Sequence, residues 1–145
     1  MRDINLLVWH CAATPEGKHF DVSDIDRWHR QRGWSGVGYH KVILLDGTVQ
    51  DGRPESKIGA HVAGKNANSI GYTYIGGVDA TGSPKDTRTP AQKEAMLRLT
   101  KEALLKYPIT RIAGHNEFAS KACPSFNVRL DELGNVPGFK KGLKV

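Results

Sequence analysis

The sequence predicts a single α/β domain in which helices flank a mixed central β-sheet. The chain has 145 residues, about the length of one domain. Short apolar segments with β-branched and aromatic residues alternate with segments whose apolar residues recur at helical spacing. Hydrophobic residues make up 39% and charged residues 25%, which excludes a disordered or low-complexity chain. We place the domain at residues 1–136 and expect a basic C-terminal tail over residues 137–145.

The first expected element is a buried strand. Residues 6–9 form a short apolar run, and we expect the strand to end near His10. Because side chains alternate along a strand, His10 lies on one face and Cys11 on the other. Cys11 is therefore interpreted as a small core residue.

A helix is expected next, with Ser23 as its N-cap and Gly33 as its stop. Its buried face is made by residues spaced three and four apart, namely Ile25, Trp28 and His29. Residues 39–50 then predict a hairpin, because Asp46-Gly47 is a dipeptide favoured in two-residue turns.

Another strand is expected over residues 70–75, followed by a polar surface loop over residues 79–88. The clearest helix signal comes next. Thr89 and Gln92 form a capping box, Pro90 occupies the first helical position and Pro108 prevents continuation. The inward stripe of this helix is Ala95, Met96, Leu99 and Ala103.

The last third of the chain predicts a short strand, a long loop and a short helix. The strand covers residues 109–113, and the loop runs through Cys123-Pro124. The helix is expected over residues 127–133, with Gly134 ending it.

Charge and cysteine content limit the partners and the compartment. Lysine and arginine total 21 and aspartate and glutamate 15, so the net charge is +6 and any polyanion is attracted. Two cysteines are too few for a disulfide framework. Neither a secretory signal nor a run of about 18 apolar residues is visible, so we expect synthesis in a reducing cytoplasm and no transmembrane segment.

Six histidines are present, and two of them fall at the carboxyl ends of predicted strands. These are His10 and His115, and Cys123 follows eight positions after His115. Two imidazoles and one thiolate make a possible three-ligand zinc site with a fourth position for water. Many chains could supply such a set, so a buried structural role for Cys123 stays open at this point. His19, in a polar loop, and His29, on a helix, are interpreted as ordinary histidines.

Four blocks of sequence appear in an order that resembles a known family. They are Trp9-His10-Cys11-Ala12-Ala13-Thr14, Gly38-Tyr39-His40, residues 59–71, and Gly114-His115 through Cys123-Pro124. Together they resemble the zinc-dependent N-acetylmuramoyl-L-alanine amidases of type 2, and most of all the short phage endolysins. Animal peptidoglycan recognition proteins share that fold. The resemblance covers about residues 6–130.

The resemblance implies roles for individual residues. His10, His115 and Cys123 match the family's ligands for one Zn²⁺ per chain. Tyr39 and Lys121 fall at the positions of a catalytic tyrosine and a catalytic lysine. The stretch that resembles the wall of the substrate groove contains His61, Asn66 and Asn68. Without the resemblance, Tyr39 would be interpreted as a half-buried aromatic residue of a strand, and Lys121 as an ordinary surface lysine.

The expected function is hydrolysis of the amide bond between N-acetylmuramic acid and L-alanine in peptidoglycan, as in bacterial cell-wall lysis. The alternative is a module that binds peptidoglycan without cutting it. A nucleic-acid-binding role is suggested only by the charge, and no specific nucleic acid partner is expected. We expect a monomer that is made in the cytoplasm and acts on the cell wall, with a separate membrane-pore protein giving access to it.

Overall fold

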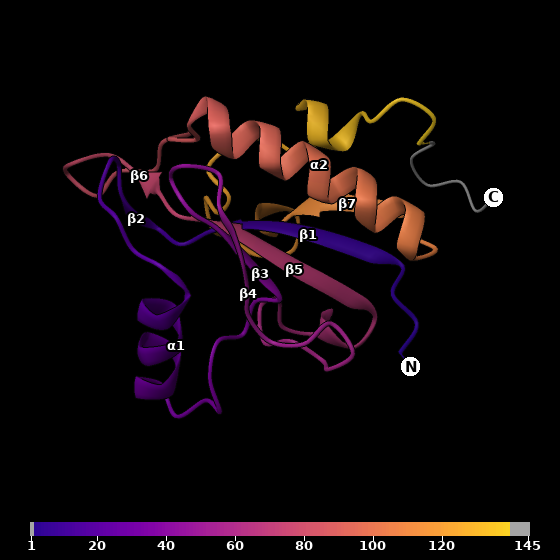
Figure 1. The fold of residues 1–145 in the computed structure, drawn as a ribbon, viewed down its shortest axis with the longest axis horizontal. Helices are drawn as coiled ribbons and strands as arrows, with labels where there is room; N and C mark the ends of the chain where they lie inside the picture. Colours follow the sequence, from indigo (N-terminus) through magenta and orange to yellow (C-terminus); the bar gives the residue numbers. More distant parts are fainter. Residues whose placement is uncertain (1, 140–145) are drawn as a thin grey trace.

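The computed structural model describes residues 2–139 and has a five-stranded mixed sheet at its centre, in the order β4-β3-β5-β1-β7. β1 pairs in parallel with β5 and β7, β3 pairs in parallel with β5, and the β3–β4 pair is antiparallel. The strand bounds are Leu6–Cys11 for β1, Lys41–Ile43 for β3, Val49–Asp51 for β4, Ser69–Tyr74 for β5 and Arg111–Gly114 for β7. The predicted fold class is confirmed (Figure 1).

Two helices lie on opposite faces of this sheet: α1 spans Val22–Gln31 and α2 spans Pro90–Lys106. Ile25 of α1 clusters with Val42 of β3, whereas the next strand residue, Ile43, clusters with Met96 of α2. Neighbouring strand residues point to opposite faces, so the two helices cover different sides. A second, two-stranded parallel sheet joins β2, Thr14–Pro15, to β6, Gly77–Val78.

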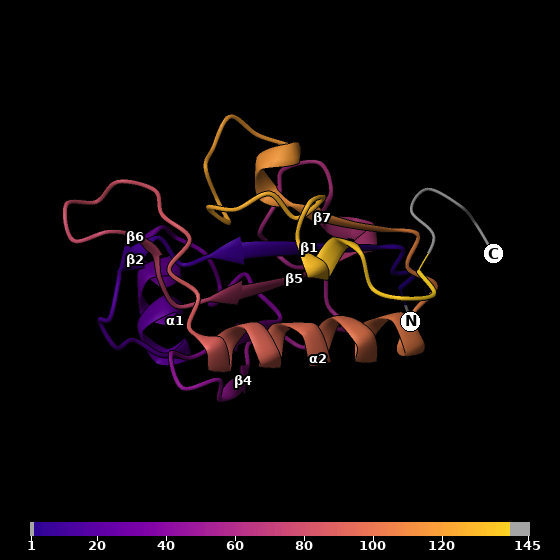
Figure 2. The same cartoon turned by 90° about the horizontal axis from the view of Figure 1, so that it is seen from above.

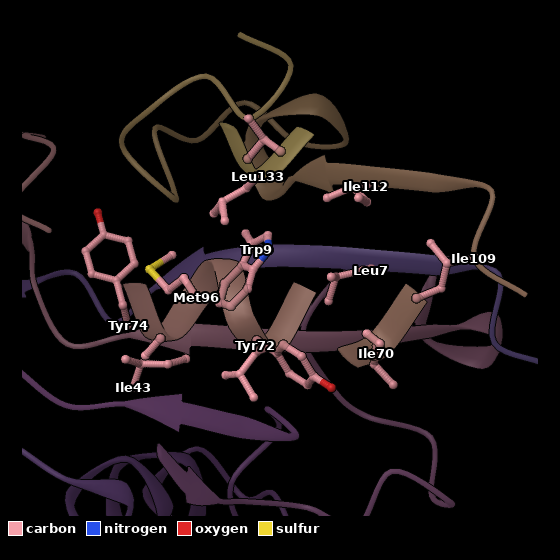
Figure 3. Close-up of a cluster of buried hydrophobic side chains, with 14 of the residues drawn as sticks. Leu7, Trp9, Ile43, Ile70, Tyr72, Tyr74, Met96, Ile109, Ile112 and Leu133 are labelled. Carbon is pink, nitrogen blue, oxygen red and sulfur yellow. The ribbon is translucent and has the colours of Figure 1, made fainter. Parts of the chain in front are cut away.

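The main core lies between α2 and the sheet (Figure 3). Leu7, Trp9 and Cys11 of β1 face α2, and Trp9 is fully buried. The indole Nε1 of Trp9 donates a hydrogen bond to Thr100 Oγ1 of α2 at 3.2 Å. The predicted stripe of α2 is buried in full and the predicted Thr89 capping box is present. His10 belongs to the other face, as the alternation predicted.

The N-cap prediction for α1 was wrong by two residues. Asp21 is the N-cap, and its carboxylate accepts hydrogen bonds from the backbone N–H of Ser23 and of Asp24. The Asp24 carboxylate accepts from the backbone N–H of Asp21 in return, which completes a capping box. The reciprocal carboxylate pair satisfies these three N–H groups, whereas a serine hydroxyl usually satisfies one.

The β3–β4 hairpin is confirmed, but its loop is longer than predicted. Ile43 pairs with Val49, the Leu44 N–H donates to the Thr48 carbonyl, and Gly47 has a φ of +87°. The loop therefore has three residues and ends on a glycine in the left-handed region, the usual alternative to a two-residue turn.

Two further expectations need correction. The loop over residues 79–88 is not wholly on the surface, because the Arg88 guanidinium is buried against Asp86 at 2.9 Å and Asp131 at 2.7 Å. No α-helix forms over residues 127–133; a single 3-10 turn spans Glu132–Gly134. Asp131 breaks the expected helix because its carboxylate both pairs with Arg88 and caps the N–H of Leu133.

Near the end of the described residues the chain returns to the core. Val136 is buried and Phe139 packs against the cluster under α2. The lysines of the expected basic tail, residues 137–145, lie outside the described residues, so the boundary after residue 136 stays a prediction. Within residues 2–139, neither helix has the length and apolarity that crossing a lipid bilayer requires.

Candidate metal centre

The sheet brings His10 and His115 side by side on the face opposite α2. His10 lies near the end of β1, and His115 follows β7 directly, in a strand pair whose register aligns Trp9 with Gly114. The centroids of the two imidazole rings are 4.8 Å apart. Figure 2 shows the segment after β7 on the side of the sheet away from α2. The rigid parallel pair therefore fixes both rings.

Cys123 completes this group from the loop that follows. Its Sγ lies 3.7 Å from His10 Nδ1, and the ligand atoms of His10, His115 and Cys123 all lie within 4.8 Å of one another. The loop is held by the Asn116 N–H, which donates to the Cys123 carbonyl at 2.7 Å. The Tyr74 hydroxyl of β5 donates to the Pro124 carbonyl at 2.6 Å.

The backbone of β1 also contacts the thiol. The Cys11 N–H donates a hydrogen bond to Cys123 Sγ at 3.2 Å. Both cysteines are free, and Cys11 is buried in the core as predicted. The neighbouring Cys11 thiol and burial raise the pKa of the Cys123 thiol. A bound cation would reverse this effect because it favours the thiolate.

These three side chains fit a zinc ion. Tetrahedral zinc, with bonds of about 2.0–2.3 Å, places its ligand atoms roughly 3.3–3.7 Å apart. The 3.7 Å between Cys123 Sγ and His10 Nδ1 agrees with that geometry. Two nitrogens and one sulfur suit zinc better than magnesium or calcium, which prefer oxygen ligands. His10 is fully buried, whereas His115 and Cys123 are half-buried, which leaves an approach from solvent.

Tyr39 lies beside His10, just before β3. The two ring centroids are 5.0 Å apart, and the Tyr39 ring also packs against His29 at 5.5 Å. Burial raises the pKa of the Tyr39 phenol, so the phenol stays a hydrogen-bond donor at neutral pH. The His29 Nδ1 accepts a hydrogen bond from the Gly38 N–H at 2.9 Å, and burial lowers the pKa of His29 to about 4. His29 is therefore neutral at pH 7, and in this form it binds the backbone of Gly38, next to Tyr39.

Lys121 is exposed in the loop that carries Cys123. After burial, the Lys121 ammonium is the next cause that lowers the pKa of His115, and it also lowers the pKa of His10. The positive charge of Lys121 is therefore close enough to both histidines to disfavour their protonation.

The three predicted groove residues lie in different surroundings. His61 is buried, and its Nδ1 lies 2.9 Å from His10 Nε2. Burial, followed by His40 and His115, lowers the pKa of His61 to about 3. Asn66 is half-buried, and its Oδ1 accepts from the backbone N–H groups of His61 and Val62 at 3.0 Å. Asn68 is exposed and donates to the Asp3 carbonyl at 2.9 Å, at the amino end of the sheet.

The sequence pattern of the N-acetylmuramoyl-L-alanine amidases matches residues 1–126. The chain belongs to this family. The endolysin of Escherichia phage T7 is 42% identical over 120 residues, which are 83% of this chain and 80% of the relative. Peptidoglycan-recognition protein SC2 of Drosophila melanogaster is 31% identical over 111 residues, 74% of this chain and 58% of that protein.

Solved structures agree with this assignment. The N-acetylmuramoyl-L-alanine amidase LysC from Clostridium intestinale URNW superposes with a TM-score of 0.81 at 31% identity, covering 96% of this chain and 88% of that one. Drosophila PGRP-LB shares the fold, with a TM-score of 0.76 at 23% identity and coverage of 100% and 88%. The amidase acts on the bond between N-acetylmuramic acid and L-alanine in peptidoglycan, and the binding-only alternative has less support.

Sequence reasoning missed part of the amidase's site. It did not single out Ser69 or Thr73 of β5, both fully buried. Ser69 Oγ lies 3.1 Å from His61 Nε2. Thr73 Oγ1 is, among residues 2–139, the buried side-chain polar atom without a hydrogen-bond partner. The available signal was strand alternation, which puts Ser69, Gly71 and Thr73 on one face of β5.

Proposed function

We propose that the amidase uses one zinc ion held by His10, His115 and Cys123, with Tyr39 and Lys121 as catalytic residues. The observation that carries this proposal is the convergence of the three ligand atoms within 4.8 Å, in a chain of an amidase family. When bound, zinc supplies a Lewis acid that polarises a carbonyl and lowers the pKa of a coordinated water to about 7.

The chain's own residues would supply the remaining needs of amide hydrolysis. Attack by water on the amide carbonyl builds negative charge on its oxygen, and the leaving amine needs a proton. The Lys121 ammonium can stabilise that oxygen, because it is exposed to solvent and near enough to His115 to lower the pKa of that ring. The Tyr39 phenol, kept protonated by burial, can orient the attacking water and relay a proton, giving its own proton to the leaving amine and taking one from the water.

Peptidoglycan is the proposed partner, and the bacterial cell wall is the proposed place of action. The net charge of +6 favours attraction to an anionic envelope. Asn66 and Asn68, together with His61, stay predicted residues of the groove wall. A monomeric state and a separate membrane-pore protein likewise stay predictions.

The proposal is tested on purified cell-wall sacculi. The protein is incubated with sacculi, and the soluble products are identified by mass spectrometry. We expect stem peptides with a free N-terminal L-alanine. EDTA should stop their release, and added zinc, but not magnesium, should restore it.

Three outcomes would contradict the proposal. Release of glycan fragments with intact peptides would show that another bond is cut. Sedimentation of the protein with sacculi without any release would show a binding module. Full activity after exhaustive chelation, with metal content below one-tenth of an equivalent, would remove zinc from the reaction.

A further inference from the structure

His61 and Ser69 form a hydrogen-bonded chain that ends on His10. His10 Nε2 lies 2.9 Å from His61 Nδ1, and His61 Nε2 lies 3.1 Å from Ser69 Oγ. His10 and Ser69 are fully buried, and His61 is 8% exposed. We propose that His61 is a positioning residue that fixes the tautomer and ring orientation of His10, with Ser69 fixing His61 in turn. This inference rests on the proposed metal site.

The direction of each hydrogen bond follows from the ligand atom of His10. The Nδ1 of His10 faces Cys123 Sγ at 3.7 Å, so Nδ1 must offer its lone pair to a metal. A neutral imidazole carries one proton, which is then on Nε2 and is donated to His61 Nδ1. His61 Nδ1 is therefore an acceptor, and its own proton lies on Nε2 and is donated to Ser69 Oγ.

Packing and hydrogen bonds fix the position of the His61 ring. A Cβ on Gly71 would lie 2.4 Å from His61 Nδ1, so the ring rests directly on the backbone of β5. The backbone here is held by Asn66 Oδ1, which accepts from the N–H groups of His61 and Val62, each at 3.0 Å. The His10 and His61 rings meet edge to face, with centroids 4.9 Å apart. The orientation of His10 is thus set by a neighbour that is itself fixed.

Partners of this kind matter for metal affinity. A ligating histidine usually donates its second N–H to a fixed acceptor, and loss of that acceptor typically costs 10–100-fold in metal affinity or activity. Here the acceptor is a second imidazole. This role differs from substrate contact, because 8% exposure leaves little of His61 for a substrate to touch.

The test compares variants that differ in the acceptor at residue 61. His61→Leu replaces the imidazole by an apolar side chain that cannot accept a hydrogen bond. In His61→Asn, the amide oxygen can accept in place of Nδ1. Zinc affinity is measured by competition with a chromophoric chelator. We expect a 10–100-fold weaker affinity in His61→Leu, recovery of at least a third of that loss on a logarithmic scale in His61→Asn, and a loss of about threefold in Ser69→Ala.

His19→Leu is the matched control, because His19 is an exposed histidine outside this chain of hydrogen bonds. Circular dichroism and thermal melting of the metal-free variants show whether each one folds. If His61→Leu does not fold, the comparison of Ser69→Ala and His61→Asn with wild type carries the test.

The tautomers give a second readout that is independent of activity. In the zinc-loaded wild type, nitrogen-15 NMR of the histidine rings should show protons on Nε2 of both His10 and His61. A proton on Nδ1 of either residue would overturn the inference. Zinc affinity equal to wild type in His61→Leu, with a raised KM, would overturn it in favour of substrate contact. Wild type that binds no zinc would instead defeat the proposed function itself.

Discussion

The two faces of β1 differ in what they contact, although their residues alternate along the same six-residue strand. Trp9 and Cys11 point into an apolar core under α2, where the Trp9 indole finds one polar partner. His10, between them, points to the other face and lies beside His61, His115, Cys123 and Tyr39. The face under α2 is therefore apolar along the strand, whereas the other face is apolar at Leu6 and Val8 and carries a polar group of side chains only around His10.

A short strand can position a site through the packing of its opposite face. The core face fixes the strand, and the fixed strand then holds the ligand atoms on the other face without further adjustment. Substitutions in the two places should therefore separate: those under α2 should change the free energy of unfolding, and those of His10, His115, Cys123 and Lys121 should change metal binding or turnover.

The largest expected effect is on the core face. Trp9→Ala leaves a cavity under α2 and should lower the free energy of unfolding by about 3–5 kcal/mol. Zinc affinity of the molecules that stay folded should be unchanged. Urea denaturation gives the first quantity, and chelator competition under native conditions gives the second. A folded variant with zinc affinity lowered tenfold would show that the two faces are coupled.

Replacing the two cysteines compares the faces directly. Cys123→Ala removes one of three protein ligands, and should weaken zinc binding by roughly 3–4 kcal/mol, or about 10²–10³-fold, and abolish most turnover. Cys11→Ala should keep zinc affinity within about threefold, because the backbone N–H contact with Cys123 stays and the lost Cys11 thiol only disfavours the thiolate, and should cost about 1 kcal/mol of stability. Metal analysis after dialysis checks both. Zinc retained in full by Cys123→Ala would refute the ligand assignment.

Lys121→Ala should separate metal binding from turnover. The variant should keep zinc and fold normally, yet lose about 10²-fold in kcat, because one charge that stabilises the oxyanion is gone. Lys121→Arg keeps the charge and should recover part of the rate. Steady-state assays on soluble muropeptides measure both. Unchanged turnover in Lys121→Ala would make it an ordinary surface lysine.

Acid should destabilise the Tyr39 segment through His29. The pKa of His29 in the folded state is about 4, below its ordinary value of 6.5, so the folded protein binds this proton more weakly than the unfolded chain. The stability contributed by the neutral ring is complete above pH 6.5 and is lost as the pH falls toward 4. We expect a loss of about 1–3 kcal/mol over that range in the metal-free protein.

His29→Asn is the variant that checks this assignment, since its amide oxygen can still accept from the Gly38 N–H but does not titrate. Thermal melts from pH 7 to pH 4 should show a shallower decline for His29→Asn than for wild type. Parallel curves would mean that His29 does not contribute to the acid sensitivity.

The smallest expected effect concerns Thr73, on the same face as His10. Its buried hydroxyl makes no hydrogen bond of regular geometry, although it lies near enough to the Tyr39 phenol to lower the pKa of that group, so Thr73→Val should raise the free energy of unfolding by at most about 1 kcal/mol. Turnover reports whether that hydroxyl serves the neighbouring Tyr39. A more stable variant with wild-type kcat would show that it does not, whereas a less stable variant would reveal a hydrogen bond, for instance to water.

Local sequence signals predicted the elements that are held by local forces. The capping box at Thr89 and the apolar stripe of α2 lie within one segment, and both are confirmed. Alternation along β1 placed His10 opposite Cys11 correctly. The structure also brings His10, His115 and Cys123 together, although their ligand roles stay proposals.

The N-cap of α1 was misplaced between neighbouring residues, Ser23 for Asp21, whereas the other failures involve residues far apart in the sequence. The expected helix over residues 127–133 does not form, because the carboxylate of Asp131 pairs with Arg88, which lies 43 positions earlier in the chain. The link between His61 and His10 spans 51 positions and depends on the bare backbone at Gly71. Neither relation leaves a periodic signal in the sequence, so neither could be predicted without the fold.

The hydrogen bond from the Cys11 N–H to Cys123 Sγ has a consequence for mutagenesis. Every residue except proline carries that N–H, so an alanine or saturation scan of position 11 would leave this contact in place and report the loss of the Cys11 side chain instead. An ester in place of the amide at residue 11, made by chemical ligation, is the substitution that removes it. The main chain can therefore tune the electron density of a proposed metal ligand in a way that side-chain substitution does not detect.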